Sequence, residues 1–322
     1  MNLLKQSYTV VDEDQAERLQ HPGPDCYYPV EIHPPRDGDV PSTVDRFVRG
    51  ILEIQTKLLK TSNVSPLIAY EIRRPNPDQL RLQFCTPTKR LDRKVRTHLS
   101  NTVSGIGFDT GVNGLPVLPE DTVGGGILTT GRKDRFPLRT DFDSPPINSL
   151  VAALHRHAMM NTRIVVQILF QPIAGRSLKE WWRKRRAYQT AGFLRKEKEK
   201  LWGSRSATPR EQSQADLVER KAGTRGFYVS IRFAVISAGE YTASRVKELA
   251  GAFNIYENPE SGQYLNATPV KSRRQKHLLG LNQAIADREF GGYSHRFRVS
   301  TEELAGLVSV PDRNQQNLET AL

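Results

Sequence analysis

The sequence has little cysteine and no long apolar run. Among its 322 residues, only Cys26 and Cys85 carry thiols, which is too few for a disulfide framework or a four-thiolate zinc site. We therefore expect a reducing, cytoplasmic compartment. No apolar stretch approaches the ~20 residues that span a bilayer, and residues 1–11 lack the pattern of a signal peptide. An integral membrane protein and a secreted protein are both disfavoured.

Catalytic motifs are lacking as well. The nearest approach to a phosphate-binding loop, at residues 126–134, has an acid where the magnesium-binding Ser or Thr would stand. His155 and His157 lie on a predicted helix, where positions i and i+2 point apart, so they suit a metal poorly. Asp141 and Asp143 precede a helix, where acids are common without a metal. We expect no catalytic residue, no metal and no cofactor, and keep an enzyme with an unrecognised site as a third alternative.

Positive charge is in excess and is concentrated in one segment. The chain has 47 Lys and Arg against 35 Asp and Glu, a formal net charge of +12. Residues 176–225 hold 15 of the basic and 6 of the acidic residues, so this segment alone carries +9. Such a concentration indicates an anionic partner, which is nucleic acid, anionic lipid or an acidic protein.

The basic segment is rich in residues that favour helices. Ser177 with Glu180 forms a capping-box pattern, and Thr208 followed by Pro209 marks a second helix start. The sequence therefore predicts a helical hairpin, with helices at about 177–203 and 208–222.

We expect this hairpin to act as a basic arm that contacts DNA or a partner, and simple solvation of its charges is the alternative. The candidate binding residues are Arg176, Lys179, Arg183, Lys184, Arg185, Arg186, Arg195, Lys196, Lys198, Lys200 and Arg205. All three tryptophans of the chain, Trp181, Trp182 and Trp202, lie in the arm. We interpret them first as residues that pack the arm against the domain, with nucleic-acid contact as the alternative.

Periodicity divides the chain into four parts. Residues 1–41 are a Pro-rich N-terminal arm, expected as a surface arm or an edge strand outside the core. Residues 42–120 form a first α+β module, residues 121–275 a second module that contains the basic insert, and residues 276–322 the C-terminal helices and tail. In the first module we expect a helix to about residue 59, strands at 67–73 and 80–85, a helix at 88–103 and a return strand at 105–108.

The second module has the order β-α-β, insert, β-α-β. Its expected strands are 125–130, 163–170, 227–236, 254–256 and 264–270, and its helices are 147–158 and 240–253. This is the split ferredoxin-like order. We therefore predict an α+β fold of two ferredoxin-like (split β-α-β) modules with a long basic helical-hairpin insert, in which a diverged duplication would explain the two halves. Two further helices are expected at 278–289 and 304–308, the latter capped by Ser300 and Glu303.

Several phrases of the sequence resemble one family. Residues 139–175 place an Asp-Ser-Pro helix start before Val-Gln-Ile-Leu-Phe-Gln-Pro, and the Trp181-Trp182 pair, FYVSIRFAVISAGEYTASRVKELAGAFNIYENP and STEELAGLVSVPD follow. Together they resemble the N-terminal, non-motor region of archaeal conjugation-type ATPases, the motors of type IV secretion and DNA transfer, over roughly residues 60–311. The resemblance implies a ferredoxin-like assembly domain that precedes a RecA-like motor.

The sequence ends at Leu322, where such a motor would begin, so no ATPase residue can be assigned. We expect a piece of a longer protein, or a stand-alone relic or partner. The resemblance implies a non-catalytic accessory or assembly region of a DNA-transfer ATPase system, and the alternative is a stand-alone nucleic-acid-binding protein. The implied partners are DNA, a RecA-like motor domain or subunit, a second copy of the chain and membrane-channel proteins. The expected location of the chain is the cytoplasm, or the membrane surface as a peripheral protein.

Overall fold

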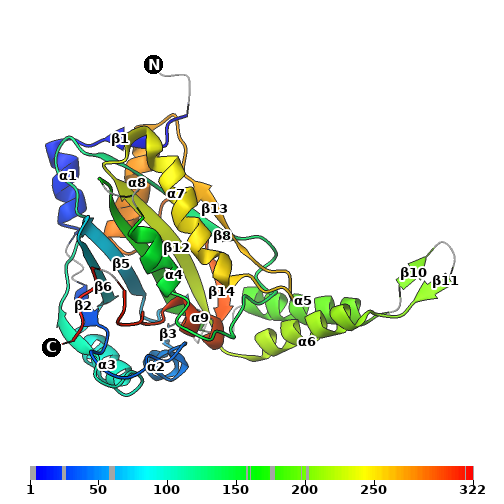
Figure 1. The fold of residues 1–322 in the computed structure, drawn as a ribbon. Coiled ribbons are helices and arrows are strands. Elements are labelled where there is room, and N and C mark those ends of the chain that lie inside the picture. The colour runs from blue at the N-terminus through cyan, green and yellow to red at the C-terminus, as the bar shows by residue number, and fades with distance from the viewer. Residues whose placement is uncertain are drawn as a thin grey trace.

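The computed structural model describes residues 5–23, 27–57, 62–156, 159, 161–174, 178–196, 198–200, 203–315 and 317–321. Ten strands of these residues form one antiparallel sheet with helices on both faces, and two further helices project from it (Figure 1). The fold is therefore α+β, as the sequence predicts.

The strands and helices have the following bounds. The strands are β1 (Tyr8–Val10), β2 (Tyr28–His33), β3 (Thr56–Lys57), β4 (Ser62–Asn63), β5 (Ile68–Asn76), β6 (Gln79–Thr86), β7 (Gly107–Thr110), β8 (Thr122–Thr130), β9 (Arg163–Pro172), β10 (Lys198–Lys200), β11 (Gly203–Arg205), β12 (Gly226–Ile236), β13 (Leu265–Pro269) and β14 (Phe297–Ser300). The helices are α1 (Glu13–Gln20), α2 (Asp45–Ile51), α3 (Lys89–Ser100), α4 (Asn148–Leu154), α5 (Leu178–Arg195), α6 (Pro209–Gly223), α7 (Thr242–Gly251), α8 (Gln275–Ala286) and α9 (Thr301–Leu307), with 3-10 segments η2 (Gly239–Tyr241) and η3 (Ala252–Tyr256).

The strands of both halves of the chain join in a single sheet. Its order is β1-β8-β12-β9-β5-β6-β2-β7, with β13 paired to β8 and β14 paired to β12. The two halves meet where β5 pairs with β9, from Ile68 opposite Phe170 to Arg74 opposite Ile164. The strands expected for two modules are therefore neighbours in one continuous sheet.

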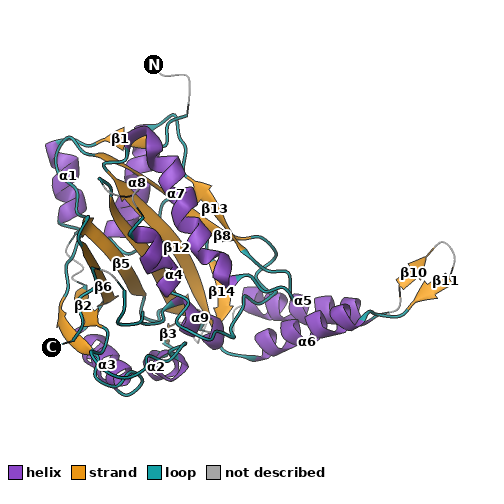
Figure 2. Cartoon of the chain, in the orientation of Figure 1, coloured by secondary structure: helices purple, strands orange, loops and turns teal. Residues whose placement is uncertain are grey.

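Strand alternation separates a main core from a second, partly polar face. Phe227, Val229, Ile231, Phe233 and Val235 of β12 point to the main core, as their alternation predicts. Helices α2, α3, α4, α7 and α9 contribute to that core, and Figure 2 shows α4 and α7 lying across the sheet. Helices α1 and α8 cover part of the opposite face.

Two expectations for the first half are wrong. The Pro-rich arm contributes β2, which pairs with β6 on one side and β7 on the other and buries Val30 and Ile32. Pro29 is tolerated because it lies near the start of the strand, just past the last β7 pair at Val30. The helix expected to reach residue 59 ends at Ile51. The backbone after it makes hydrogen bonds outside the helix, since the Gln55 carbonyl accepts from the Val64 amide at 3.0 Å.

One strand expected in the second half is also wrong. Residues 254–256 belong to η3, which continues directly from α7. Tyr256 is buried there and stacks on Phe253, with ring centroids 5.8 Å apart. A short apolar run is compatible with either a helix or a strand. Here the burial of the two rings against the core favours the helical conformation.

The segment expected as a helical hairpin contains α5 and α6, which pack against each other and project from the sheet (Figure 1). Small residues let the two helices approach closely: Ala187 and Ala191 of α5 meet Ala215, Val218 and Ala222 of α6. The first helix ends at Arg195 rather than near residue 203, and the short β10–β11 pair follows it.

The start of α6 provides a test of the hairpin's local stability. Thr208 Oγ1 accepts from the Glu211 amide at 3.3 Å, and Glu211 Oε2 accepts from the Thr208 amide at 2.9 Å. We expect Thr208→Ala to lower the free energy of unfolding by about 1 kcal/mol, because an amide of the first turn loses its acceptor. Urea unfolding would measure this loss, and Thr208→Ser should restore most of it. An alanine variant as stable as the wild type would show that the cap is not formed.

Candidate nucleic-acid interface

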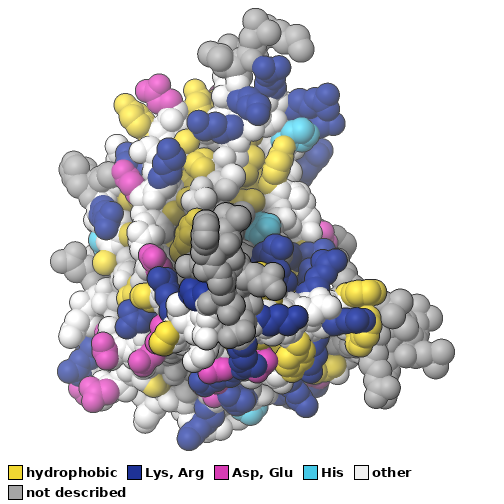
Figure 3. All heavy atoms as spheres, turned by 90° about the vertical axis from the view of Figure 1, so that its right-hand side faces the viewer, with side chains coloured by type: hydrophobic (Ala, Val, Ile, Leu, Met, Phe, Trp, Pro, Cys, Tyr) yellow, Lys and Arg dark blue, Asp and Glu magenta, His cyan; other side chains and the backbone are white. Residues whose placement is uncertain are grey.

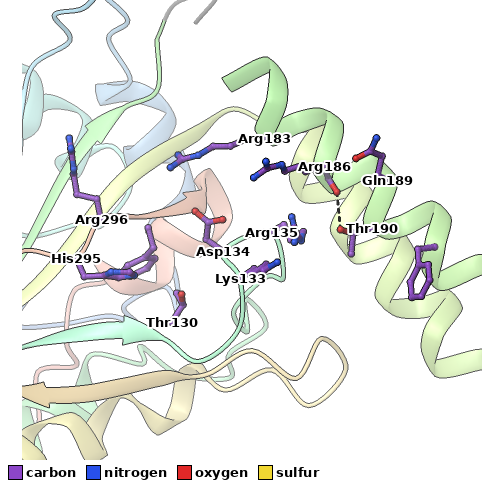
Figure 4. Close-up of a pocket in the computed structure, with 12 residues that line it drawn as sticks. Thr130, Lys133, Asp134, Arg135, Arg183, Arg186, Gln189, Thr190, His295 and Arg296 are labelled. Carbon is purple, nitrogen blue, oxygen red and sulfur yellow. Dashed lines mark hydrogen bonds between the residues drawn. The ribbon is translucent and has the colours of Figure 1, made fainter. Parts of the chain in front are cut away.

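A cleft with a volume of about 590 Å³ lies where α5 leaves the body of the protein. One wall is α5, and the other is formed by the end of β8, the loop at residues 131–135 and the start of β14. Figure 4 shows the Arg183 and Arg186 side chains extending from α5 above the loop that carries Lys133, Asp134 and Arg135. The lining residues are Thr130, Lys133, Asp134, Arg135, Arg183, Arg186, Gln189, Thr190, Phe193, His295, Arg296 and Phe297.

The packing of α5 decides which of its residues enter the cleft. Arg183, Arg186 and Thr190 are spaced by three and four residues, so they share one helix face. Ala187 and Ala191 lie on the neighbouring face and are buried against α6. The contact with α6 therefore sets the rotation of α5 and turns this arginine face to the cleft.

A buried ion pair attaches the hairpin to the body. Lys221 Nζ of α6 lies 2.9 Å from Glu303 Oε1 of α9, and the two side chains are 6% and 0% exposed. The Glu303 carboxylate also accepts from the backbone amides of Leu138, at 2.7 Å, and Ser300, at 2.6 Å. These three contacts use the lone pairs of the Glu303 carboxylate. The ion pair therefore fixes α6 to the end of the sheet where the cleft opens.

Basic side chains dominate the electrostatics of the cleft. Five Lys and Arg line it against one acid, Asp134, whose Oδ2 accepts from the Arg298 amide at 3.1 Å. Burial lowers the pKa of the Arg135 guanidinium, and Arg186 lowers it further against the opposing effect of Asp134. The buried Nε of Arg135 has no hydrogen-bond partner among the described residues. An anion in the cleft would relieve the repulsion between these guanidinium groups.

Arg183 is held in place more firmly than the other basic residues of the cleft lining. Its Nη1 lies 3.2 Å from the Tyr228 hydroxyl and 3.4 Å from Glu180 Oε1. Burial and the hydrogen bond to Glu180 raise the pKa of Tyr228 to about 12, so its hydroxyl stays protonated and donates to Glu180.

Three other basic residues of the lining are exposed and make no ion pair with any described residue: Lys133, Arg186 and Arg296. We call these three side chains the cleft cations.

The structure separates the predicted basic residues of the arm. Arg183 and Arg186 line the cleft, whereas Arg185 lies over the rings of Trp181 and Trp182, at 5.3 and 5.6 Å. Lys184 and Lys196 are exposed outside the cleft lining. The predicted RKRR run is therefore divided between two surfaces.

Two other predicted arginines are held in ion pairs within the hairpin. Arg195 binds Glu219, at 2.6 Å, and Asp216, at 2.5 Å, and so joins α5 to α6. Arg205 lies 3.0 Å from Glu211. For the remaining predicted residues, only the backbone of Lys179, Lys198 and Lys200 is described, and Arg176 and Trp202 lie outside the described residues.

The tryptophans that the structure describes do not pack the arm against the body. Trp181 and Trp182 are 53% and 50% exposed, with their rings edge to face at 5.0 Å. The expectation that these two residues act as buried anchors is therefore wrong. Alanines and ion pairs hold the hairpin instead, and the aromatic rings remain available at the surface.

Sequence reasoning missed the opposite wall of the cleft. Lys133 and Arg135 stand in a Gly-Arg-Lys-Asp-Arg run directly after a strand, and His295 precedes Arg296 just before β14. By its sequence pattern alone, the first run indicates only an incomplete phosphate-binding loop. The available signal was the presence of short basic clusters at strand ends, which becomes informative once the two strands are known to be close in space.

The other candidate sites remain without support in the described part of the chain. The described residues contain no group of three or more His, Cys, Asp and Glu side chains that could hold a metal ion. Helix α4 ends at Leu154, so His155 follows the helix, and His157 lies outside the described residues. No helix in the described ranges is long and apolar enough to cross a membrane.

Comparison with models of protein families identifies the family of the chain. Residues 1–321 match the family model described as a domain of unknown function, DUF8128. No curated protein matches the chain.

Proposed function

The chain belongs to the DUF8128 family, and because that family has no assigned function, we propose one from the surface of the protein itself: the cleft beside α5 binds the phosphate backbone of nucleic acid. The observation that carries the proposal is the excess of cations on the cleft walls. The three cleft cations make no ion pair with a described residue, and the single acid of the lining already accepts a backbone amide. Consecutive phosphates of a nucleic-acid backbone present several separate negative charges along the cleft, which a single small anion does not.

Exposed aromatic side chains on the same helix support nucleic acid over other polyanions. Phe193 lines the cleft and is 64% exposed, and Trp181 and Trp182 are half exposed on α5. Nucleic-acid-binding grooves combine basic side chains with aromatic rings on which bases stack.

The wider role that we propose is a non-catalytic assembly or accessory region of a conjugation-type DNA-transfer ATPase system, in which this cleft handles DNA. The sequence phrases between residues 139 and 311 support this role by resemblance. A stand-alone nucleic-acid-binding protein is the alternative, and both share the same cleft. Only the accessory role requires docking to a motor subunit, so a test of that docking distinguishes the two roles.

Two split β-α-β modules, related by duplication, are part of this proposal. Apart from the short β3–β4 pair in the first and the segment from α5 to α6 in the second, the series β2-α2-β5-β6-α3-β7 and β8-α4-β9-β12-α7-β13 have the same element order. Within each series the strands lie in the sheet in the order second, third, first, fourth: β5-β6-β2-β7 and β9-β12-β8-β13. This repeated order supports two ferredoxin-like units that pair through their second strands.

Salt-titrated binding tests the proposed function. Fluorescently labelled single-stranded DNA, duplex DNA, RNA and anionic phospholipid vesicles would each be titrated with the full chain. We expect nucleic-acid affinity to fall steeply with salt, with a log–log slope of about −3 to −4 on a single strand if all five basic residues of the lining contact phosphates. Binding to the vesicles alone, or no salt-dependent binding to any nucleic acid, would contradict the proposal.

A further inference from the structure

A second group of basic side chains lies between β13 and the first turn of α8. Lys271, Arg273, Arg274 and Lys276 are all exposed, and none forms an ion pair with a described residue. The first turn of α8 contains no acid, and Arg274 at its N-cap provides no side-chain acceptor. The positive end of the helix therefore adds to the charge of these residues. We call this group the α8 patch.

An exposed aromatic ring stands at the border of the α8 patch. Tyr293 is 40% exposed, and its hydroxyl oxygen lies 3.1 Å from His277 Nδ1. The two rings meet edge to face with centroids 5.6 Å apart, and Ser272 Oγ lies 2.9 Å from the same His277 nitrogen. These contacts hold the Tyr293 ring in one orientation, in which part of it remains open to solvent.

The chain connects this ring directly to the cleft. From Tyr293 it continues through Ser294 to His295 and Arg296, which line the cleft. Three residues span about 10 Å at most, so the ring and the cleft wall are close neighbours. Figure 3 shows Lys and Arg side chains at the top of this side of the molecule and again beside the projecting hairpin, with histidine side chains between them.

We infer that a single strand of nucleic acid crosses this face, with its phosphates in the cleft and on the α8 patch and one base stacked on Tyr293. The inference rests on the proposed function and adds the path and the strandedness of the ligand. A base within a duplex already has both faces stacked, so only an unpaired base can use the exposed ring. Two separate groups of cations joined by an aromatic ring match the combination of backbone contacts and stacking by which proteins hold single strands.

Oligonucleotide length distinguishes the inferred path from the cleft alone. The patch variant carries Lys271→Ala, Arg273→Ala and Lys276→Ala, and leaves Arg274 because it begins α8. On a thymidine oligonucleotide of about twenty nucleotides we expect this variant to lose about 100-fold in affinity near 0.1 M salt. On the shortest oligonucleotide that still binds, which occupies the cleft without reaching the patch, we expect little change.

Tyr293 tests the strandedness. Tyr293→Ala should weaken binding of the long single strand about tenfold and leave duplex binding unchanged, whereas Tyr293→Phe should bind like the wild type because it keeps the ring. Circular dichroism and thermal unfolding of the alanine variant check that it remains folded, and the phenylalanine variant separates the ring from the hydrogen bond to His277.

Each contrary result identifies what has failed. If the patch variant binds the long strand normally while alanines at the three cleft cations weaken it, the path is wrong and the proposed function stands. If Tyr293→Ala weakens single strand and duplex equally, the stacked base is wrong. If alanines at the cleft cations change neither oligonucleotide, the proposed function fails, and the inference fails with it.

Discussion

Replacing Glu71 with glutamine is expected to lower the free energy of unfolding by about 3–5 kcal/mol. Glu71 lies in β5 on the partly polar face of the sheet and is 1% exposed. Its Oε1 accepts from Arg288 Nε at 2.8 Å, and its Oε2 accepts from Arg73 Nη1 at 2.8 Å. Glutamine keeps the size of the side chain but leaves these buried guanidinium groups without an anion.

The surrounding network explains why the loss is large. Gln167 and Gln83 donate to the same carboxylate, at 2.9 and 2.8 Å, and Gln167 also accepts from the buried Arg232. Burial lowers the pKa of Arg232 to about 10, so its positive charge is already costly. Removal of the one carboxylate at the centre therefore destabilises several buried cations together.

The loss of unfolding free energy caused by Glu71→Gln is expected to depend on pH. Burial raises the pKa of the Glu71 carboxyl, but Arg288 and Arg73 outweigh it and hold the pKa at about 2, below its ordinary value of 4.5. A depressed pKa contributes stability that is fully present above pH ~4.5 and is lost as the pH falls toward 2. Urea unfolding at pH 7 and pH ~3 should therefore show the gap between wild type and Glu71→Gln narrowing by about half.

Two further variants isolate the effect of the Glu71 charge. Glu17→Gln, at an exposed position of α1, should change stability by less than about 0.5 kcal/mol. Adding Arg288→Met to Glu71→Gln should recover part of the loss, because one unpaired buried cation is removed with its anion. Equal losses from Glu17→Gln and Glu71→Gln would show that the network contributes no more than a surface charge.

Alanine at all three cleft cations is expected to reduce single-stranded DNA affinity about 100-fold near 0.1 M salt. Lys133, Arg186 and Arg296 come from three different segments of the chain, and all three line the cleft. Each phosphate contact that is lost keeps about 0.7 of a counterion on the strand, and the three losses multiply. The exposed positions should leave stability nearly unchanged, and fluorescence anisotropy would measure the affinity.

The hairpin offers a control of equal charge. Lys184→Ala, Arg185→Ala and Lys196→Ala also remove three positive charges, but from exposed positions outside the cleft lining. We expect this control variant to bind within about threefold of the wild type, because these three side chains do not line the cleft and contact no phosphate bound in it. If both triple variants lose affinity equally, the arm attracts nucleic acid through its overall charge and the cleft has no special part.

Local patterns predicted much of the second half of the fold. The alternation in β12 and the nearly continuous apolar run in β9 are confirmed, as are the helix start at Thr208 and Pro209 and the cap at Ser300. These features depend on residues a few positions apart. The pairing of β5 with β9, which joins the halves, depends on residues far apart in the chain and leaves no local pattern.

The errors have the same physical origin. Six prolines in residues 22–41 suggested an arm, yet the alternation of Val30 and Ile32 between two of those prolines places β2 inside the sheet. For the cleft, the charge of α5 could be read from the sequence, but the packing of Ala187 and Ala191 selects which arginines face it. Its second wall comes from residues 131–135 and from β14, which the fold alone brings together.

The salt dependence of single-stranded DNA binding tests the central claim most directly. The log–log slope would be measured for the wild type, the triple alanine variant of the cleft cations and the control variant of equal charge. We predict that the cleft variant lowers the magnitude of the slope by about 2 and that the control leaves it at the wild-type value. A cleft variant with the slope of the wild type would contradict the assignment of this cleft as the site that binds the nucleic-acid backbone.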